Sequence, residues 1–109
     1  MTFARDPDVE VEIYLLPYSE GGRQSPAFNG YRSQHQIRTD YQTTGTHQYE
    51  QREQLEPGER SRGTITFITP EVYPNSLRAG DVIDILEDSR LVGRATILRV
   101  LNRSLERTG

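Results

Sequence analysis

Hydrophobic and polar residues alternate along much of the chain, most regularly in the run VEVEIYLL at residues 9–16. The alternation would put apolar side chains on one face and glutamate or tyrosine side chains on the other. The apolar face would consist of Val9, Val11, Ile13 and Leu15. A period of two with β-branched residues is typical of a strand that is buried on one side.

Further segments of strand-like composition follow, and turns separate them. They span residues 31–39, 43–54, 63–74, 82–86 and 89–101. The segment TTGTHQYEQREQ (43–54) is so polar that we expect it at a sheet edge or facing solvent. Residues with a strong preference for turns lie between the segments, at Pro57-Gly58, Pro74-Asn75, Ala79-Gly80-Asp81 and, as a tight hairpin, Asp88-Ser89-Arg90.

The connections predict an all-β domain. Residues 17–30 contain three glycines and two prolines, which indicates a long loop after the first strand, and no segment predicts a long helix. Five to seven strands at short spacing indicate a sandwich or a barrel. We favour a closed barrel, because closure leaves no exposed edge in a chain with few apolar residues. We predict one barrel domain at residues 8–102, with flexible termini at 1–7 and 103–109.

Composition narrows the classes of function. The chain has 109 residues, of which 33% are hydrophobic and 27% charged, and its net charge is -3. The absence of cysteine excludes disulfides and thiolate chemistry, and with only two histidines it argues against a zinc site. The 13 basic residues are all arginine. The absence of lysine excludes a phosphate-binding loop that depends on lysine and a Schiff-base mechanism.

The N-terminal sequence MTFARDPDVE lacks a positive region followed by an apolar stretch, which argues against a secretory signal. No apolar run reaches the length that spans a membrane. We therefore expect a soluble cytoplasmic protein, and Met1 favours a natural short chain.

Candidate chemistry is sparse. The carboxylate pairs Glu10/Glu12 and Asp81/Asp84 have the residue type for acid–base catalysis, but no nucleophile, metal set or oxyanion donor accompanies them. We predict no enzymatic activity, no cofactor and no metal. His35 lies on the same strand face as Ile37, so we expect a hydrogen-bonded residue that fills space, whereas His47 lies in a polar segment and should face solvent.

The order of several motifs resembles the C-terminal, third domain of bacterial elongation factor Tu. The similarity runs from about residue 9 to residue 101 and is strongest in EGGRQSPAFNGYRSQHQIRT (20–39). The matching residues are Gly21-Gly22-Arg23, Gly30-Tyr31-Arg32, Gln34, Arg38-Thr39, Pro57-Gly58 and Arg90-Leu91-Val92-Gly93. The resemblance implies a six-stranded antiparallel Greek-key barrel. It also implies a domain without catalysis, since the GTPase site of that family lies in a separate first domain.

The resemblance further implies a binding surface. In that family the third domain docks on the GTPase domain and on the second barrel, contacts the T-arm of aminoacyl-tRNA, and meets the exchange factor Ts. Some antibiotics bind at its interface with the GTPase domain. The corresponding docking loop here would consist of Gly21, Gly22, Arg23, Tyr31 and Arg32.

Four residues match positions along the RNA, namely Arg23, Gln34, Thr44 and Arg90. Arginine suits phosphate through its planar guanidinium, and the amide and hydroxyl groups could hydrogen-bond to ribose or phosphate. Arg32, by contrast, could pair with acidic side chains and link neighbouring strands. Gly21, Gly22 and Gly30 are expected where a loop needs positive φ.

One departure argues against tRNA as the main ligand. Where the family has a glycine pair before the arginine of the last hairpin, this chain has Asp88-Ser89. A carboxylate about 5 Å from a phosphate would cost on the order of 3 kcal/mol. We therefore expect a module that docks a protein of the translation machinery or a protein that recognises the elongation factor. The alternatives are an RNA-binding module for the T-arm, and a detached scaffold domain of a larger GTPase or a homodimer.

Overall fold

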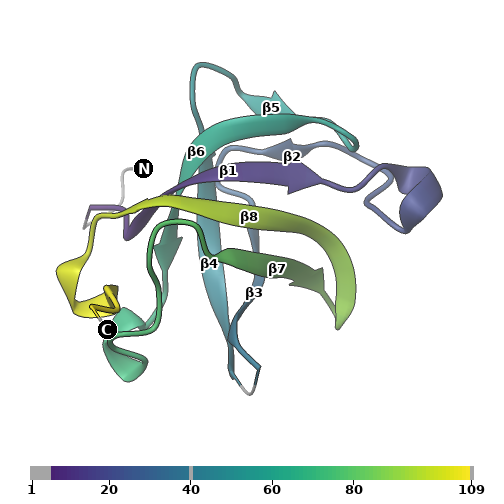
Figure 1. Cartoon of the computed structure of the whole chain (residues 1–109). Coiled ribbons are helices and arrows are strands. Elements are labelled where there is room, and N and C mark those ends of the chain that lie inside the picture. The colour runs from purple at the N-terminus through teal and green to yellow at the C-terminus, as the bar shows by residue number, and fades with distance from the viewer. Residues whose placement is uncertain (1–5, 40, 109) are drawn as a thin grey trace.

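The computed structural model describes residues 6–39 and 41–108, and in this part of the chain it is an all-β fold (Figure 1). Six strands form a closed barrel: β1 (Val9–Leu15), β3 (Arg32–Arg38), β4 (Tyr41–Tyr49), β6 (Arg60–Phe67), β7 (Val82–Glu87) and β8 (Arg90–Val100). Two short strands, β2 (Ala27–Phe28) and β5 (Gln54–Leu55), pair as a separate ribbon. Three 3₁₀ turns complete the fold: η1 (Tyr18–Glu20), η2 (Pro70–Val72) and η3 (Arg103–Leu105). No helix in the described ranges is long and apolar enough to cross a bilayer.

The barrel has Greek-key topology. Its strand order is β1-β6-β4-β3-β7-β8, and all pairings are antiparallel. The barrel strands β3, β4 and β6 follow one another along the chain and lie side by side, and β6 returns beside β1, the first strand, which completes a Greek key. The prediction of a six-stranded antiparallel Greek-key barrel is therefore confirmed.

The alternation of β1 places its apolar residues inside the barrel. Val9, Val11, Ile13 and Leu15 are fully buried, as their spacing predicted. The predicted strand at 63–74 is shorter than expected, because β6 ends at Phe67 and η2 follows at Pro70. The predicted hairpin at Asp88 is confirmed by the pairing of β7 with β8.

The prediction for the polar segment 43–54 is wrong. Its main part is β4, which lies between β6 and β3 rather than at an edge. The inward face of β4 carries Thr43, Gly45, His47 and Tyr49, all of them buried. A Cβ atom on Gly45 would lie 2.9 Å from Cε1 of His35 and 2.7 Å from Cγ2 of Ile65, so the glycine makes room for a histidine ring inside the barrel.

Two histidines meet in the barrel interior. His35 on β3 and His47 on β4 are both fully buried, and their Nε2 atoms lie 2.8 Å apart. Nδ1 of His47 lies 3.2 Å from the Tyr49 hydroxyl. One imidazole must donate its Nε2–H and the other must accept, so the accepting ring is neutral, and burial favours the neutral form of both rings by lowering their pKa values. The expectation for His35 is confirmed, whereas His47 does not face solvent as expected.

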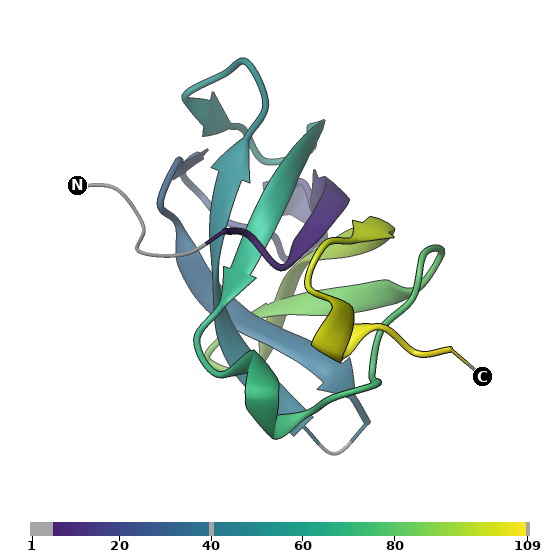
Figure 2. The same ribbon diagram turned by 90° about the vertical axis from the view of Figure 1, so that its left-hand side faces the viewer.

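The C-terminal residues, predicted to form a flexible tail after 102, pack against the barrel instead. The Leu105 side chain is fully buried, and its carbonyl oxygen accepts hydrogen bonds from the N–H groups of Ser76 and Leu77, each at 2.9 Å. Arg107 donates its N–H to the Leu77 carbonyl at 2.7 Å. Figure 2 shows η3 covering the end of the barrel beside η2. A single leucine in a polar sequence gave no periodic signal, and residues 1–5 of the other predicted terminus lie outside the described ranges.

The folded C-terminal segment leads to a stability prediction. We expect Leu105→Ala to lower the free energy of unfolding by about 2–5 kcal/mol, because it removes a fully buried side chain and leaves a cavity. Urea denaturation followed by circular dichroism would measure the change. The matched control, Leu101→Ala, alters an exposed leucine and should cost less than about 1 kcal/mol. Equal effects of the two substitutions would contradict the packing of η3.

The histidine pair predicts loss of stability in acid. Burial lowers the pKa of His35 to about 4, and burial together with the neighbouring imidazole lowers the pKa of His47. Because the unfolded histidines take up protons near pH 6.5, the stabilising contribution is complete above that pH and is lost as the pH falls toward about 4. We expect the free energy of unfolding to fall by about 2–4 kcal/mol over this range.

Urea titrations at several pH values would measure this loss. Between pH 6.5 and 5 the change should come mainly from the histidines, because carboxylates titrate at lower pH. Histidine ring resonances in NMR spectra provide a control that does not need a variant. They should show no titration while the protein stays folded above pH 5. Stability that is constant between pH 6.5 and 5 would contradict the neutral pair.

Candidate docking site at one end of the barrel

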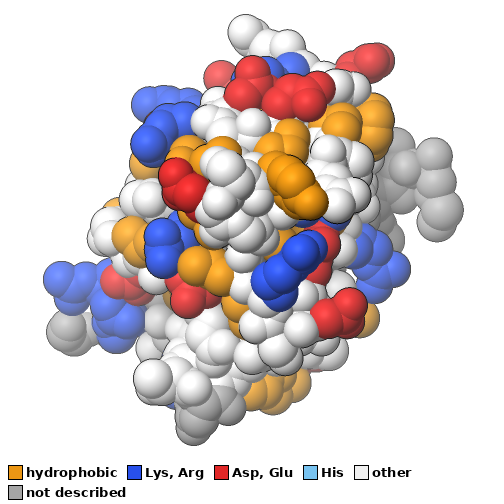
Figure 3. Space-filling model, turned by 90° about the vertical axis from the view of Figure 1, so that its right-hand side faces the viewer, with side chains coloured by type: hydrophobic (Ala, Val, Ile, Leu, Met, Phe, Trp, Pro, Cys, Tyr) orange, Lys and Arg blue, Asp and Glu red, His pale blue; other side chains and the backbone are white. Residues whose placement is uncertain are grey.

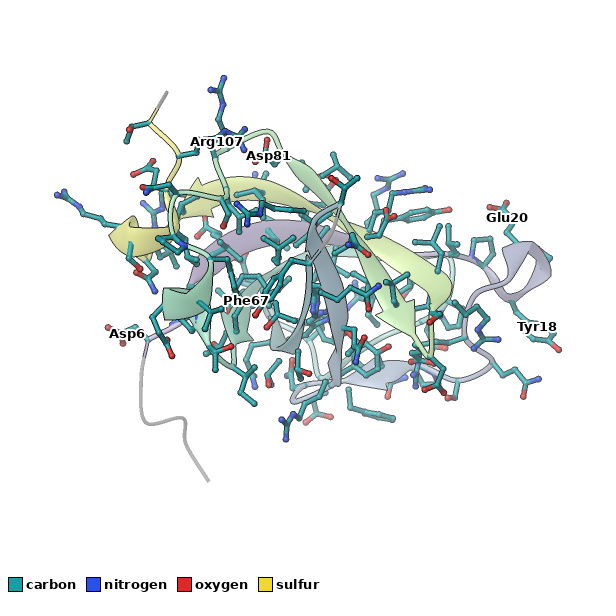
Figure 4. All side chains as sticks on the ribbon, turned by 90° about the horizontal axis from the view of Figure 1, so that it is seen from below. Asp6, Tyr18, Glu20, Phe67, Asp81 and Arg107 are labelled. Carbon is teal, nitrogen blue, oxygen red and sulfur yellow. The ribbon has the colours of Figure 1, made fainter. Side chains whose placement is uncertain are left out.

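The long loop after β1 forms an arm, defined here as residues 16–30, that projects beyond the barrel. Figure 4 shows Tyr18 and Glu20 at the far end of this arm. The chain turns at Gly21, whose φ is +95° and whose N–H donates to the Tyr18 carbonyl at 3.0 Å. Gly22 is required for space, because a Cβ there would lie 1.9 Å from the Leu16 carbonyl oxygen. The glycines therefore give the arm a fixed shape.

Arg23 ties the arm to the barrel. Its guanidinium donates to the Ser25 carbonyl at 3.1 Å and to the Pro26 carbonyl at 3.2 Å, and it forms an ion pair with Glu87 at the end of β7. It also lies over the Tyr31 ring, 4.6 Å from the centroid, and its side chain is only 18% exposed. The arginine predicted to contact RNA phosphate thus makes its contacts within the protein.

Glu87 is the acceptor at the centre of this cluster. Its carboxylate accepts from the Tyr31 hydroxyl and from Arg23, and Arg90 lies 3.7 Å away. Burial would raise the pKa of Glu87, but the hydrogen bonds from Tyr31 and Arg23 outweigh it and lower the pKa. Burial and the bond to Glu87 raise the pKa of Tyr31. Glu87 and Arg23 are therefore both charged at neutral pH, and their ion pair is formed.

Beside this cluster lies a groove of about 440 Å³, which we call the rim groove. It is lined by Arg23, Tyr31, Arg32, Ser33, Gln34, Leu86, Glu87 and Asp88. The groove is lined by two of the predicted docking residues, Tyr31 and Arg32, and by Gln34, which was predicted to contact RNA. Thr44 lies directly across from Gln34 on the neighbouring strand β4. Arg90 lies on the hairpin beyond Glu87, and Gly21 and Gly22 lie in the arm.

The formal charges around the rim groove cancel. Arg23 and Arg32 supply two positive charges, and Glu87 and Asp88 supply two negative charges. Arg32 makes no ion pair with any described residue, so the expected link between strands is not formed. The field at this rim is therefore mixed in sign rather than basic.

The hairpin that carries Asp88 has an unusual backbone. Asp88 has φ +50° and Ser89 has φ +70°, a conformation that glycine adopts most easily. Aspartate and serine side chains therefore stand at a turn whose backbone geometry favours glycine. The carboxylate of Asp88 borders the rim groove, where it would repel a phosphate.

Sequence reasoning missed two features of this end of the molecule. Glu87 was not identified, because its partners Tyr31 and Arg23 lie 56 and 64 residues away along the chain. The exposed aromatic residues of the arm, Tyr18 and Phe28, are 60% and 55% exposed, and the loop prediction alone did not indicate that they face solvent.

No model of a known protein family matches this sequence. Among the described residues, no group of three or more histidine, cysteine, aspartate or glutamate side chains could hold a metal ion. The arrangement at the rim offers hydrogen-bonding groups, mixed charges and exposed aromatic side chains.

The cluster predicts how the arm is held. We expect Arg23→Ala to destabilise the protein by about 1–3 kcal/mol, because it removes the charged group that donates to the partly buried Glu87 carboxylate. The substitution should also speed amide hydrogen exchange in residues 17–28. Urea denaturation and hydrogen exchange with mass spectrometry would measure the two effects.

A matched control is available on the barrel wall. Arg94→Ala removes a more exposed ion pair with Asp84 and should change stability by less than about 1 kcal/mol, without affecting exchange in the arm. Unchanged exchange in the arm of Arg23→Ala would show that the glycines alone hold it.

Proposed function

We propose that this protein is a non-catalytic binding module that docks a protein partner at the end of the barrel formed by the arm and the rim groove. The observation that supports the proposal is that the Arg23 guanidinium makes its contacts inside the protein. Because this guanidinium is bound to Glu87 and stacked on Tyr31, the loop presents shape and aromatic surface instead of a free phosphate-binding group.

The charge at the rim disfavours nucleic acid. Nucleic-acid affinity depends mainly on cations that neutralise phosphates. Here Arg23 and Arg90 both contact Glu87, and Asp88 adds a further negative charge at the groove. Only Arg32 among the groove residues is a free cation within the described ranges.

The exposed side chains suit a protein. Aromatic residues are enriched at the centres of protein interfaces, and Tyr18 and Phe28 are both largely exposed on the arm. The Arg23–Glu87 contact fixes the arm before a partner binds, which reduces the entropy lost on association. The resemblance to the elongation factor barrel suggests a partner in translation, or a protein that recognises the elongation factor.

One observation favours RNA as a second candidate. Gln34 and Thr44, the two residues matched to the T-arm contact, are directly opposed on adjacent strands, so their side chains point from the same face. With Arg32 they form a polar row that could follow a ribose-phosphate backbone.

The two candidates differ in their response to salt. We expect the immobilised full chain to retain one or more proteins from a lysate of its own cells at salt concentrations that release RNA. Retention should fall roughly tenfold in Tyr18→Ser, since loss of an interface aromatic commonly costs more than 1 kcal/mol. The control Val72→Ser changes a residue of similar exposure, 58%, at η2 on the other side of the molecule and should have no effect.

Filter binding of labelled tRNA tests the alternative directly. A protein module should bind tRNA no better than non-specifically, and replacing Asp88 and Ser89 with glycine should raise that binding. Salt-sensitive tRNA binding that is lost in Gln34→Ala would overturn the proposal in favour of RNA. If no retained protein depends on Tyr18, the proposal would be overturned in favour of a scaffold or a homo-oligomer. Size-exclusion chromatography would distinguish these two.

A further inference from the structure

We propose that the docking partner contributes a basic segment of protein chain that lies across the β2–β5 ribbon and packs on Phe28. This inference rests on the proposed function. The segment would carry arginine or lysine residues beside apolar ones. Three observations support this chemistry: the exposed ring, the carboxylates around it, and the rigidity of the ribbon.

The ribbon has one buried face and one open face. Ala27 pairs with Leu55 and Phe28 pairs with Gln54. Ala27 and Leu55 are buried in the core, so the alternation of the strands turns Phe28 and Gln54 outward. Phe28 lies outside the core cluster and is 55% exposed. The backbone carbonyl of Phe28 accepts from the Tyr31 N–H at 2.8 Å, a bond that does not depend on the side chain.

Carboxylates without ion pairs lie on the ribbon and in the turn that precedes β5. Gln54 donates from Nε2 to Oε2 of Glu56 at 2.6 Å, which places that carboxylate on the same face as Phe28. Glu50 and Glu53 precede the strand, and both are exposed. None of these three glutamates makes an ion pair with a described residue. By contrast, carboxylates on the barrel wall such as Glu10 and Asp84 are matched by arginines.

The picture of the surface agrees with this distribution. Figure 3 shows acidic side chains gathered at the top of this end of the molecule, where β5 lies in Figure 1, with hydrophobic side chains directly below them. An exposed aromatic ring beside unpaired carboxylates suits cationic side chains, whose aliphatic stems pack on the ring while their heads reach the carboxylates. Acidic peptides and nucleic acids would be repelled.

The ribbon is held in place before binding. Asn29 donates from Nδ2 to the Arg52 carbonyl at 3.0 Å and accepts from the Tyr49 N–H at 2.6 Å. Its own N–H donates to the Glu53 carbonyl at 2.9 Å. Arg52 in turn pairs with Glu59 at 2.9 Å. Phe28 and the glutamates are therefore presented on a fixed backbone, as a specific docking surface requires.

A library of random peptides displayed on phage, selected on the immobilised full chain, provides the test. We expect the enriched peptides to combine arginine or lysine with aromatic or aliphatic residues. Synthetic copies should lose roughly tenfold in affinity on Phe28→Ser. They should lose a smaller factor on the double variant Glu53→Gln, Glu56→Gln, and that variant should also show a weaker salt dependence. The control Glu71→Gln, at η2, should bind as the unchanged protein does.

Enrichment of acidic or neutral peptides, the absence of enrichment, or binding unaffected by Phe28→Ser would each overturn this inference. These outcomes are separable from failure of the proposed function. A partner whose retention depends on Tyr18 but not on Phe28 or the glutamates would leave the docking function standing while removing the basic segment from it. All substituted residues are exposed or lie outside the core, and circular dichroism would confirm that each variant is folded.

Discussion

Closure of the barrel through β1 is the constraint on which the rest of the structure depends. β1 pairs with β6 along one edge and with β8 along the other, so both neighbours must meet it in register. Closure encloses one face of every barrel strand, including β4, whose sequence is mostly polar. The interior is completed by a histidine pair whose Nε2 atoms lie 2.8 Å apart in one hydrogen bond and by Gly45, which leaves the rings room. A buried polar pair of this kind is tolerated because it is hydrogen-bonded.

Polar interactions then fasten the two ends of the barrel. At one end the buried Asp8 carboxylate accepts from the Phe67 N–H at 2.7 Å and from Asn102 Nδ2 at 2.8 Å, which links the start of β1 to β6 and to the segment after β8. At the other end Arg23 and Tyr31 converge on Glu87. The first arrangement completes the closed wall. The second holds the projecting arm against the barrel. At both ends a carboxylate that accepts several hydrogen bonds links segments that are distant in the sequence.

The sequence predicted those elements whose local pattern decides their structure. β1 was evident from its period of two, and the β7–β8 hairpin from Asp88-Ser89 between two apolar runs. The central position of β4 was not predictable, because its inward residues are polar and their burial depends on a partner ring from β3. The Arg23–Glu87 contact was hidden for a similar reason, since each residue looks like an ordinary surface charge until the fold brings them together. Local pattern thus gave the strands, the turns and the all-β class, whereas the six-stranded Greek-key topology was implied by the family resemblance. The composition of the site depends on contacts between distant segments.

The arginines illustrate why composition is a poor guide to the ligand. At least seven of the 13 form ion pairs with carboxylates among the described residues, namely Arg23, Arg52, Arg60, Arg90, Arg94, Arg99 and Arg107. An arginine committed to a carboxylate contributes little to the field that attracts phosphate. Around Phe28 the balance is reversed, because glutamates remain unpaired there. The charge exposed at the surface is therefore set by which ions the fold leaves unmatched, and around Phe28 those ions are negative.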